Sequence, residues 1–99
     1  MYINPMTTPQ PITFDDAKDT VNRERHGMSL SEAARFDFET AYVRVDDRHD
    51  YGERREIAIG LIGRRLHVLV FTMRDETVRA ISLRKANLRE IKLYDQARP

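Results

Sequence analysis

Two pairs of adjacent cations and one histidine are the residues of this chain best suited to chemistry on a phosphate. Arg84 and Lys85 are neighbours, as are Arg54 and Arg55, and His67 lies between the two pairs. Arginine binds phosphate through two parallel hydrogen bonds, and an unperturbed histidine titrates at about 6.5, which suits proton transfer. We therefore expect a phosphate site at Arg84 and Lys85, with Arg54 and Arg55 lining the same cleft and His67 carrying protons.

Each of these residues also has an ordinary structural explanation. The four cations could be solvated surface charges, which contribute little to stability. A single histidine in a strand more often has a structural role. His26 directly precedes Gly27, where it would stabilise the end of a helix, although a role in a site also stays open.

The composition limits the classes of protein to consider. With 99 residues the chain allows one domain, and without cysteine it has no thiol nucleophile, disulfide or cysteine zinc site. It contains neither an HExxH pattern nor a glycine-rich phosphate loop, so we expect no metal and no nucleotide cofactor. No apolar run is long enough to span a membrane. We expect a cytoplasmic protein.

The charge is unevenly distributed along the chain. Residues 1–50 contain six Lys and Arg against ten Asp and Glu, whereas residues 51–99 contain eleven against six. An ordinary charged surface would explain this, but a polyanion site on the basic half is the alternative.

Local signals predict the helices that would position these residues. We expect a short strand at 12–14 and then a helix over 15–26, ended by Gly27 in the left-handed conformation. Ser29 and Glu32 have the spacing of a capping box, which predicts a second helix. A last helix should run from Arg84 or Lys85 to residue 96, so that its N-terminal N–H groups would support the phosphate site. Residues 1–11 should form a flexible tail, and residues 12–97 a single domain.

Alternating apolar residues predict strands at 42–45, 56–62, 66–72 and 77–83. Two-residue turns at Gly63–Arg64 and Arg74–Asp75 would join the last three as antiparallel hairpins. In that register His67 and Ser82 are paired, and helices should cover a face that contains the apolar residues Ile57, Ile59, Leu61, Leu66, Val68, Val70, Ile81 and Leu83. The chain is therefore expected to have an α+β fold, with an antiparallel sheet of three to four strands, two N-terminal helices and one C-terminal helix.

Several stretches of the sequence, in order, resemble the BrnT toxin family. They are Phe14-Asp15-Asp16-Ala17-Lys18, then Asn22, then Arg25-His26-Gly27-Met28-Ser29, and finally Arg79-Ala80-Ile81-Ser82-Leu83-Arg84-Lys85-Ala86. The likeness covers about residues 13–95. Phe14 stands where the family usually has tryptophan, and Lys85 where arginine is frequent.

The resemblance implies a RelE-like microbial ribonuclease fold and a toxin of a type II toxin–antitoxin pair. Its activity would be metal-independent cleavage of RNA that inhibits translation, without a cofactor. A BrnA-like antitoxin would neutralise it, and operator DNA would be bound only through their complex.

In this reading the cations named above would stabilise charge during cleavage, with further RNA contacts from Arg79, Arg89 and Tyr94. Packing is the favoured role for Tyr94, and Arg79 could equally pair with a buried acid. Glu53 and Glu90 are possible proton carriers. Because no acid–base pair is evident, a non-catalytic RNA- or protein-binding module remains the alternative.

Overall fold

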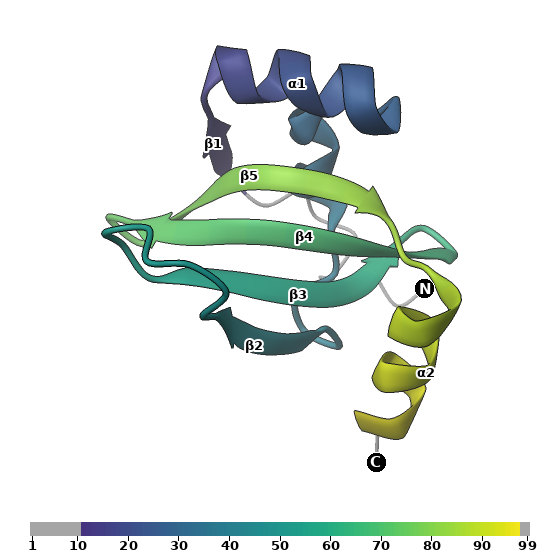
Figure 1. Cartoon of the computed structure of the whole chain (residues 1–99). Helices are drawn as coiled ribbons and strands as arrows, with labels where there is room; N and C mark the ends of the chain where they lie inside the picture. The colour runs from purple at the N-terminus through teal and green to yellow at the C-terminus, as the bar shows by residue number, and fades with distance from the viewer. Residues whose placement is uncertain (1–10, 98–99) are drawn as a thin grey trace, which may run out of the picture.

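The computed structural model describes residues 11–97, which form one five-stranded mixed sheet with helices packed around it (Figure 1). The elements in chain order are β1 (Ile12–Phe14), α1 (Asp16–His26), the 3-10 helix η2 (Leu30–Arg35), β2 (Tyr42–Asp46), β3 (Arg55–Ile62), β4 (Arg65–Arg74), β5 (Thr77–Lys85) and α2 (Leu88–Ala97). None of these helices is long and apolar enough to cross a membrane. Except for Pro11, the tail predicted at residues 1–11 lies outside the described residues.

The α+β class is confirmed, but the sheet differs from the prediction. Its strand order is β1-β5-β4-β3-β2, and β1 runs parallel to β5 while all other pairs are antiparallel. The expected sheet of three to four antiparallel strands is therefore wrong in strand number and in direction. A three-residue edge strand carries too little sequence signal to predict its partner, because pairing depends on the distant strand β5.

Helix α1 begins and ends where its caps predict. The Asp15 side chain accepts hydrogen bonds from the backbone N–H groups of Ala17 and Lys18, at 2.8 and 3.2 Å. At the other end Gly27 has a φ of 69°, and its N–H donates to the carbonyl of Arg23. These interactions are local, so the helix could be predicted from the sequence.

Asn22 attaches α1 to the edge of β5. Its Nδ2 donates to the carbonyls of Leu83 and Met28, both at 2.9 Å, and its Oδ1 accepts from the Leu83 N–H at 2.9 Å. β1 pairs only with residues 78–80 of β5. One buried amide side chain therefore replaces a neighbouring strand further along that edge, where backbone groups would otherwise lack partners.

The second helix is shorter and tighter than the capping box predicts. It is the 3-10 helix η2, and the Ser29 hydroxyl accepts from the N–H of Ser31. After it, Phe36 has extended backbone angles, and the N–H of Asp37 donates to the carbonyl of Leu61 in β3. Tertiary pairing with the sheet thus ends a helix that local propensity would have extended.

One of the two predicted hairpin turns is correct. Ile62 pairs with Arg65 around Gly63–Arg64, as expected. In the second hairpin Arg74 pairs with Thr77, so the turn is Asp75–Glu76, with φ of 51° and 65°. The predicted turn at Arg74–Asp75 is therefore wrong by one residue.

A β-bulge in β5 changes the register further along the second hairpin. Phe71 pairs with Ala80, but the preceding residue, Val70, pairs with Ser82, so Ile81 is the extra residue. His67 consequently lies opposite Lys85, and the predicted pairing of His67 with Ser82 is wrong. The bulge turns Ser82 and Arg84 onto the sheet face opposite to His67.

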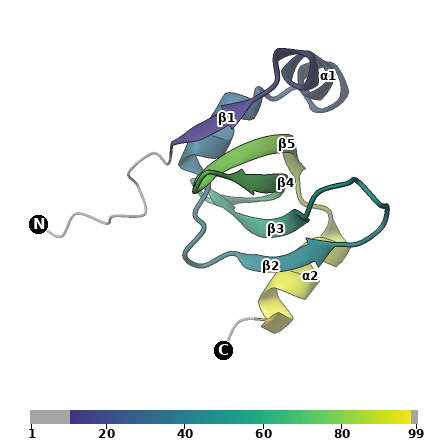
Figure 2. The same ribbon diagram turned by 90° about the vertical axis from the view of Figure 1, so that its left-hand side faces the viewer.

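The two sheet faces are covered differently from the prediction. Helix η2 packs on the face that carries Ala58, Leu69 and Leu83, whereas α1 lies along the edge of β5. On the opposite face, Ile57, Ile59 and Val68 pack with residues of α2. The sheet lies between α1 and α2 (Figure 2). Since α2 covers only part of the second face, the remainder is open for a site.

Gly60 is packed so closely that a larger residue should destabilise the fold. A Cβ atom there would lie 2.6 Å from Cζ of Phe36 and 3.0 Å from Cβ of Ala41. We predict that Gly60→Ala lowers the free energy of unfolding by about 1–3 kcal/mol, the usual cost of overpacking. Urea denaturation would measure this. Adding Phe36→Leu to Gly60→Ala should recover part of the lost free energy of unfolding. If the two substitutions instead lower it by the sum of their separate effects, the proposed clash would be contradicted.

Candidate functional site

A polar pocket of about 230 Å³ lies on the sheet face that α2 covers only in part. We call it the arginine pocket, and its lining residues are Arg44, Asp46, Arg48, Tyr51, Arg55, Ile57, Val68, Val70, Ile81, Ser82, Arg84 and Glu90. Its apolar part comes from β3, β4 and β5. Its charged part comes from β2, the loop that follows β2, the beginning of β3, the end of β5 and α2.

Arg84 is held in the pocket by Glu90. The two guanidinium NH₂ groups donate to the two carboxylate oxygens at 2.7 and 2.6 Å. Glu90 is itself fixed in the first turn of α2, because its Oε1 accepts from the Asn87 N–H while its own N–H donates to Asn87 Oδ1. The hydrogen bonds from Arg84 lower the pKa of Glu90 and raise the pKa of Arg84. This pair places a cation at the pocket with a fixed orientation.

Asp46 organises the opposite wall of the pocket. Its side chain is fully buried and accepts from Nε and NH2 of Arg48, at 2.8 and 2.9 Å. The Tyr51 hydroxyl donates to the same carboxylate at 3.2 Å. The hydrogen bond from Arg48 holds the pKa of Asp46 well below its usual range, so this carboxylate stays ionised.

Arg55 completes this wall through its contact with Tyr51. Its guanidinium lies over the tyrosine ring, 4.0 Å from the centroid, which is a cation–π geometry. Its Nε donates to Glu53 at 3.2 Å. Tyr51 therefore links Asp46 to Arg55, and the loop between β2 and β3 is folded over the sheet by these contacts.

The lining of the pocket has an excess of positive charge. Four arginines face two carboxylates, and Arg44 makes no ion pair within residues 11–97. Each of the other three arginines keeps N–H groups that its acidic partner does not occupy. Such an arrangement suits an anion with several oxygens, such as a phosphate, because guanidinium groups donate to it from several directions.

The structure brings together three of the residues proposed from the sequence, Arg84, Arg55 and Glu90. Lys85 follows Arg84 in β5 and therefore lies on the other sheet face. On that face it pairs with His67 of β4. His67 is buried, and its Nδ1 lies 2.8 Å from the carbonyl of Arg65. Neither residue lines the arginine pocket, so the expected grouping of Arg84, Lys85 and His67 is wrong.

Other proposed residues also lie outside this pocket. Arg54 pairs with Glu56 and lines a different hollow near Thr72. Arg79 is half-buried opposite Thr72, and Arg89 is exposed on α2. Tyr94 is only 2% exposed and packs in the core, so it cannot stack on a base without unfolding locally.

The predicted helix N-terminus at Arg84 and Lys85 is also absent. Both residues belong to β5, and α2 begins only at Leu88. The N–H of Ala86 donates to the carbonyl of Leu66, which continues the sheet pairing past the expected helix start. Asn87 and Glu90 then cap the helix.

Four residues of the pocket were not predicted from the sequence: Arg44, Asp46, Arg48 and Tyr51. The alternation of β2 does place Arg44 on the same face as Tyr42 and Asp46, which was a usable signal. Arg48 and Tyr51 lie in an irregular loop, where residue spacing does not predict direction. Within residues 11–97 no three histidine or acidic side chains form a group that could hold a metal ion.

Asp46 offers a test of whether orientation or net charge governs the pocket. We predict that Asp46→Asn weakens the binding of an RNA phosphate about tenfold, because the hydrogen bonds that position Arg48 and Tyr51 lose their charged acceptor. The change also adds one unit of positive charge to the pocket. Measurement of Kd for a single-stranded RNA distinguishes the two effects, since affinity equal to or above wild type would show that orientation by Asp46 is unimportant.

The buried position of His67 predicts a pH dependence of stability. Burial lowers the pKa of His67 below its ordinary value of 6.5. Between the lowered pKa and 6.5 the unfolded chain binds a proton that the folded chain does not, so stability should fall as the pH falls through 6.5. His67→Asn retains a donor for the Arg65 carbonyl and should reduce this dependence. Urea denaturation at several pH values from 7.5 to 5 would measure the free energy of unfolding of both proteins. The same change with pH in wild type and His67→Asn would contradict the prediction.

Comparisons with known proteins agree with this picture. Residues 14–90 match the family described as "Ribonuclease toxin, BrnT, of type II toxin-antitoxin system". The crystal structure of the Brucella abortus ribonuclease toxin BrnT is similar, with a TM-score of 0.57 and 25% sequence identity, over 79% of this chain and 97% of that one. A comparison with curated protein sequences gave no match. The family match covers most of the sequence, and the chain therefore belongs to the BrnT family of ribonuclease toxins of type II toxin–antitoxin systems.

Proposed function

We propose that this chain is a metal-independent endoribonuclease that cuts mRNA at the arginine pocket and thereby inhibits translation and growth. The observation that supports this most directly is the convergence of Arg44, Arg48, Arg55 and Arg84 on one open sheet face. Family membership supports ribonuclease activity in general. The proposal adds the location, the chemistry and the biological target.

The chemistry we propose uses the RNA's own 2′-hydroxyl as nucleophile. Its oxygen forms a bond to the adjacent phosphorus while the bond from phosphorus to the 5′-oxygen breaks, which leaves a 2′,3′-cyclic phosphate and a 5′-hydroxyl. A base accepts the hydroxyl proton during attack, and the departing 5′-oxygen takes a proton from water. No metal is needed if cations stabilise the extra negative charge that develops on the phosphoryl oxygens.

The described residues favour charge stabilisation over strong acid–base catalysis. No histidine lines the arginine pocket, and its two carboxylates are both bound to arginine. The lowered pKa of Glu90 makes it a weak base. We therefore assign the main contribution to Arg84, Arg48 and Arg55, and Glu90 is a candidate to accept the hydroxyl proton.

The decisive experiment uses purified protein and a labelled single-stranded RNA, first free in excess EDTA and then, without EDTA, in a translating cell-free extract. We expect fragments with 2′,3′-cyclic phosphate ends. The same oligonucleotide with 2′-deoxy sugars throughout should remain intact, because it lacks the nucleophile. Cleavage of the deoxy substrate, or a strict requirement for added magnesium, would contradict the mechanism.

A non-catalytic RNA-binding module would give a different result in the same experiment. It would bind the RNA in a salt-sensitive manner and yield no fragments in either setting. That outcome would refute the nuclease proposal while leaving a phosphate-binding role for the arginine pocket.

We further propose that a BrnA-type partner neutralises the toxin and binds operator DNA. We also propose that the chain acts in the cytoplasm and that its fold is related to that of RelE. A type II toxin–antitoxin family implies an antitoxin. Expression of this chain alone should arrest growth, and co-expression with the adjacent reading frame should restore it. Growth arrest that the neighbour does not relieve would argue against that neighbour as antitoxin.

A further inference from the structure

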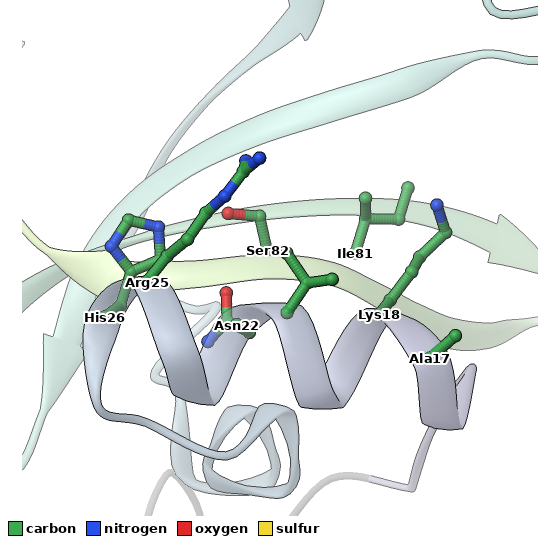
Figure 3. Close-up of a pocket in the computed structure, with 8 residues that line it drawn as sticks. Ala17, Lys18, Asn22, Arg25, His26, Ile81 and Ser82 are labelled. Atoms are coloured by element: carbon green, nitrogen blue, oxygen red, sulfur yellow. The ribbon is translucent and has the colours of Figure 1, made fainter.

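A second pocket, of about 350 Å³, lies between α1 and the edge of β5 (Figure 3). We call it the helix-edge pocket, and its lining residues are Ala17, Lys18, Val21, Asn22, Arg25, His26, Ile81 and Ser82. In Figure 3 the side chains of Lys18 and Arg25 extend from α1 toward the part of β5 that contains Ile81 and Ser82. The helix exists at this position because Asn22 binds β5.

The helix-edge pocket has cationic and no acidic lining residues. Lys18 and Arg25 are seven positions apart, which places them on one side of a helix and about 10 Å apart along its axis. Both are exposed, and neither makes an ion pair within the described part of the chain. Arg23, by contrast, is neutralised by Asp19 at 2.9 Å. Within the described residues, the Lys and Arg side chains of α1 that make no ion pair are therefore the two beside β5.

The two pockets adjoin each other at β5. Ile81 and Ser82 line both the arginine pocket and the helix-edge pocket. These two residues are at the β-bulge, where the chain contains one residue more than β4 opposite. A bulge bends the strand and increases its twist. Here the bulge residues lie between the open sheet face and the side of α1.

We propose that the helix-edge pocket binds a second phosphate of the same RNA strand, with Lys18 and Arg25 as its ligands and His26 beside them. The strand passes over Ile81 and Ser82 from the cleavage site in the arginine pocket. This inference rests on the proposed ribonuclease function. It makes a specific prediction about length, because only an RNA long enough to reach both pockets gains from the second one.

The test compares wild type with the double variant Lys18→Gln/Arg25→Gln. The probes are single-stranded 2′-O-methyl RNAs of three and twelve nucleotides, which cannot be cut, at a series of salt concentrations. For the twelve-nucleotide probe we expect the Kd of the double variant to be tenfold higher or more. The slope of log association constant against log salt concentration should become less negative by about 1.4, as for two lost phosphate contacts to a single strand. The three-nucleotide probe should bind both proteins equally.

Arg23→Gln is the matched control, since it removes a cation from the same helix outside the helix-edge pocket. It should leave both affinities within twofold of wild type. Thermal denaturation would establish that all variants are folded. Because these probes report binding, the outcome is independent of whether the wild-type protein cleaves RNA.

Two results would overturn the inference. One is an equal loss of affinity for both probe lengths, which would indicate a general charge effect. The other is unchanged RNA affinity together with lost neutralisation by the co-expressed antitoxin, which would assign the helix-edge pocket to an acidic protein segment. Absence of RNA cleavage by wild type, with the length-dependent loss intact, would refute only the proposed nuclease function.

Discussion

Replacing Arg84 by glutamine is expected to reduce kcat/KM for RNA cleavage about a hundredfold or more. Loss of one well-placed donor to a developing negative charge commonly costs about 2.7–4 kcal/mol of transition-state stabilisation. Arg84 fits this role because Glu90 binds two of its N–H groups and fixes its orientation at the arginine pocket. Arg84→Lys should retain the charge, lose the planar fork and recover only part of the activity.

The pairing with Glu90 requires a second variant to separate catalysis from folding. Arg84→Gln leaves Glu90 without its cation, although that side chain is only 17% exposed. The double variant Arg84→Gln/Glu90→Gln removes this unpaired charge, so stability should return while activity stays low. Because Glu90 is also the candidate proton acceptor, the single variant Glu90→Gln measures its own part of the activity loss. Arg64→Gln, in the exposed turn between β3 and β4, should behave like wild type. Normal cleavage by the double variant would remove Arg84 from the mechanism.

Asn22→Ala is expected to lower the free energy of unfolding by about 3 kcal/mol or more. The change removes three buried hydrogen bonds of 2.9 Å and leaves the N–H and carbonyl of Leu83 without partners. Each buried unsatisfied group costs about 1–3 kcal/mol. Domains of this size are typically stable by about 5–15 kcal/mol, so the variant should be close to unfolding. Urea denaturation would measure the change.

The exposed residue Glu24, on the same helix, supplies the control for Asn22. Glu24→Ala should change stability by less than about 0.5 kcal/mol, as expected for a surface site. A loss below about 1 kcal/mol in Asn22→Ala would show that water or a shifted helix replaces the amide. Asn22→Asp should be at least as damaging, because a carboxylate cannot donate to the Leu83 and Met28 carbonyls.

The parts of the fold that could be predicted are those with local causes. Helix α1 has a capping side chain at Asp15 and a left-handed glycine at its end, both within a few residues of the helix. The first hairpin turn, Gly63–Arg64, follows from a glycine between two apolar runs. Both predictions were confirmed, because each depends on interactions between near neighbours in the sequence.

The errors come from interactions between distant residues. The bulge at Ile81 depends on how β5 pairs with β4 while it also contacts α1. Nothing in the sequence of β5 alone requires a bulge there. It placed Arg84 on the opposite sheet face from His67, although a regular hairpin would have grouped them. The charge asymmetry was similarly misleading, since Arg44 and Arg48 come from the acidic half of the chain.

The sequence by itself determined the class of the fold, the bounds of α1, the strand pattern, and a likeness to BrnT that the family match confirms. It also identified Arg55 and Arg84 as cations of interest. Only the tertiary structure decided which cations meet. A binding pocket is formed by strands and loops that are far apart along the chain, so its membership depends on strand order and register, and a one-residue change of register moves a side chain to the other face.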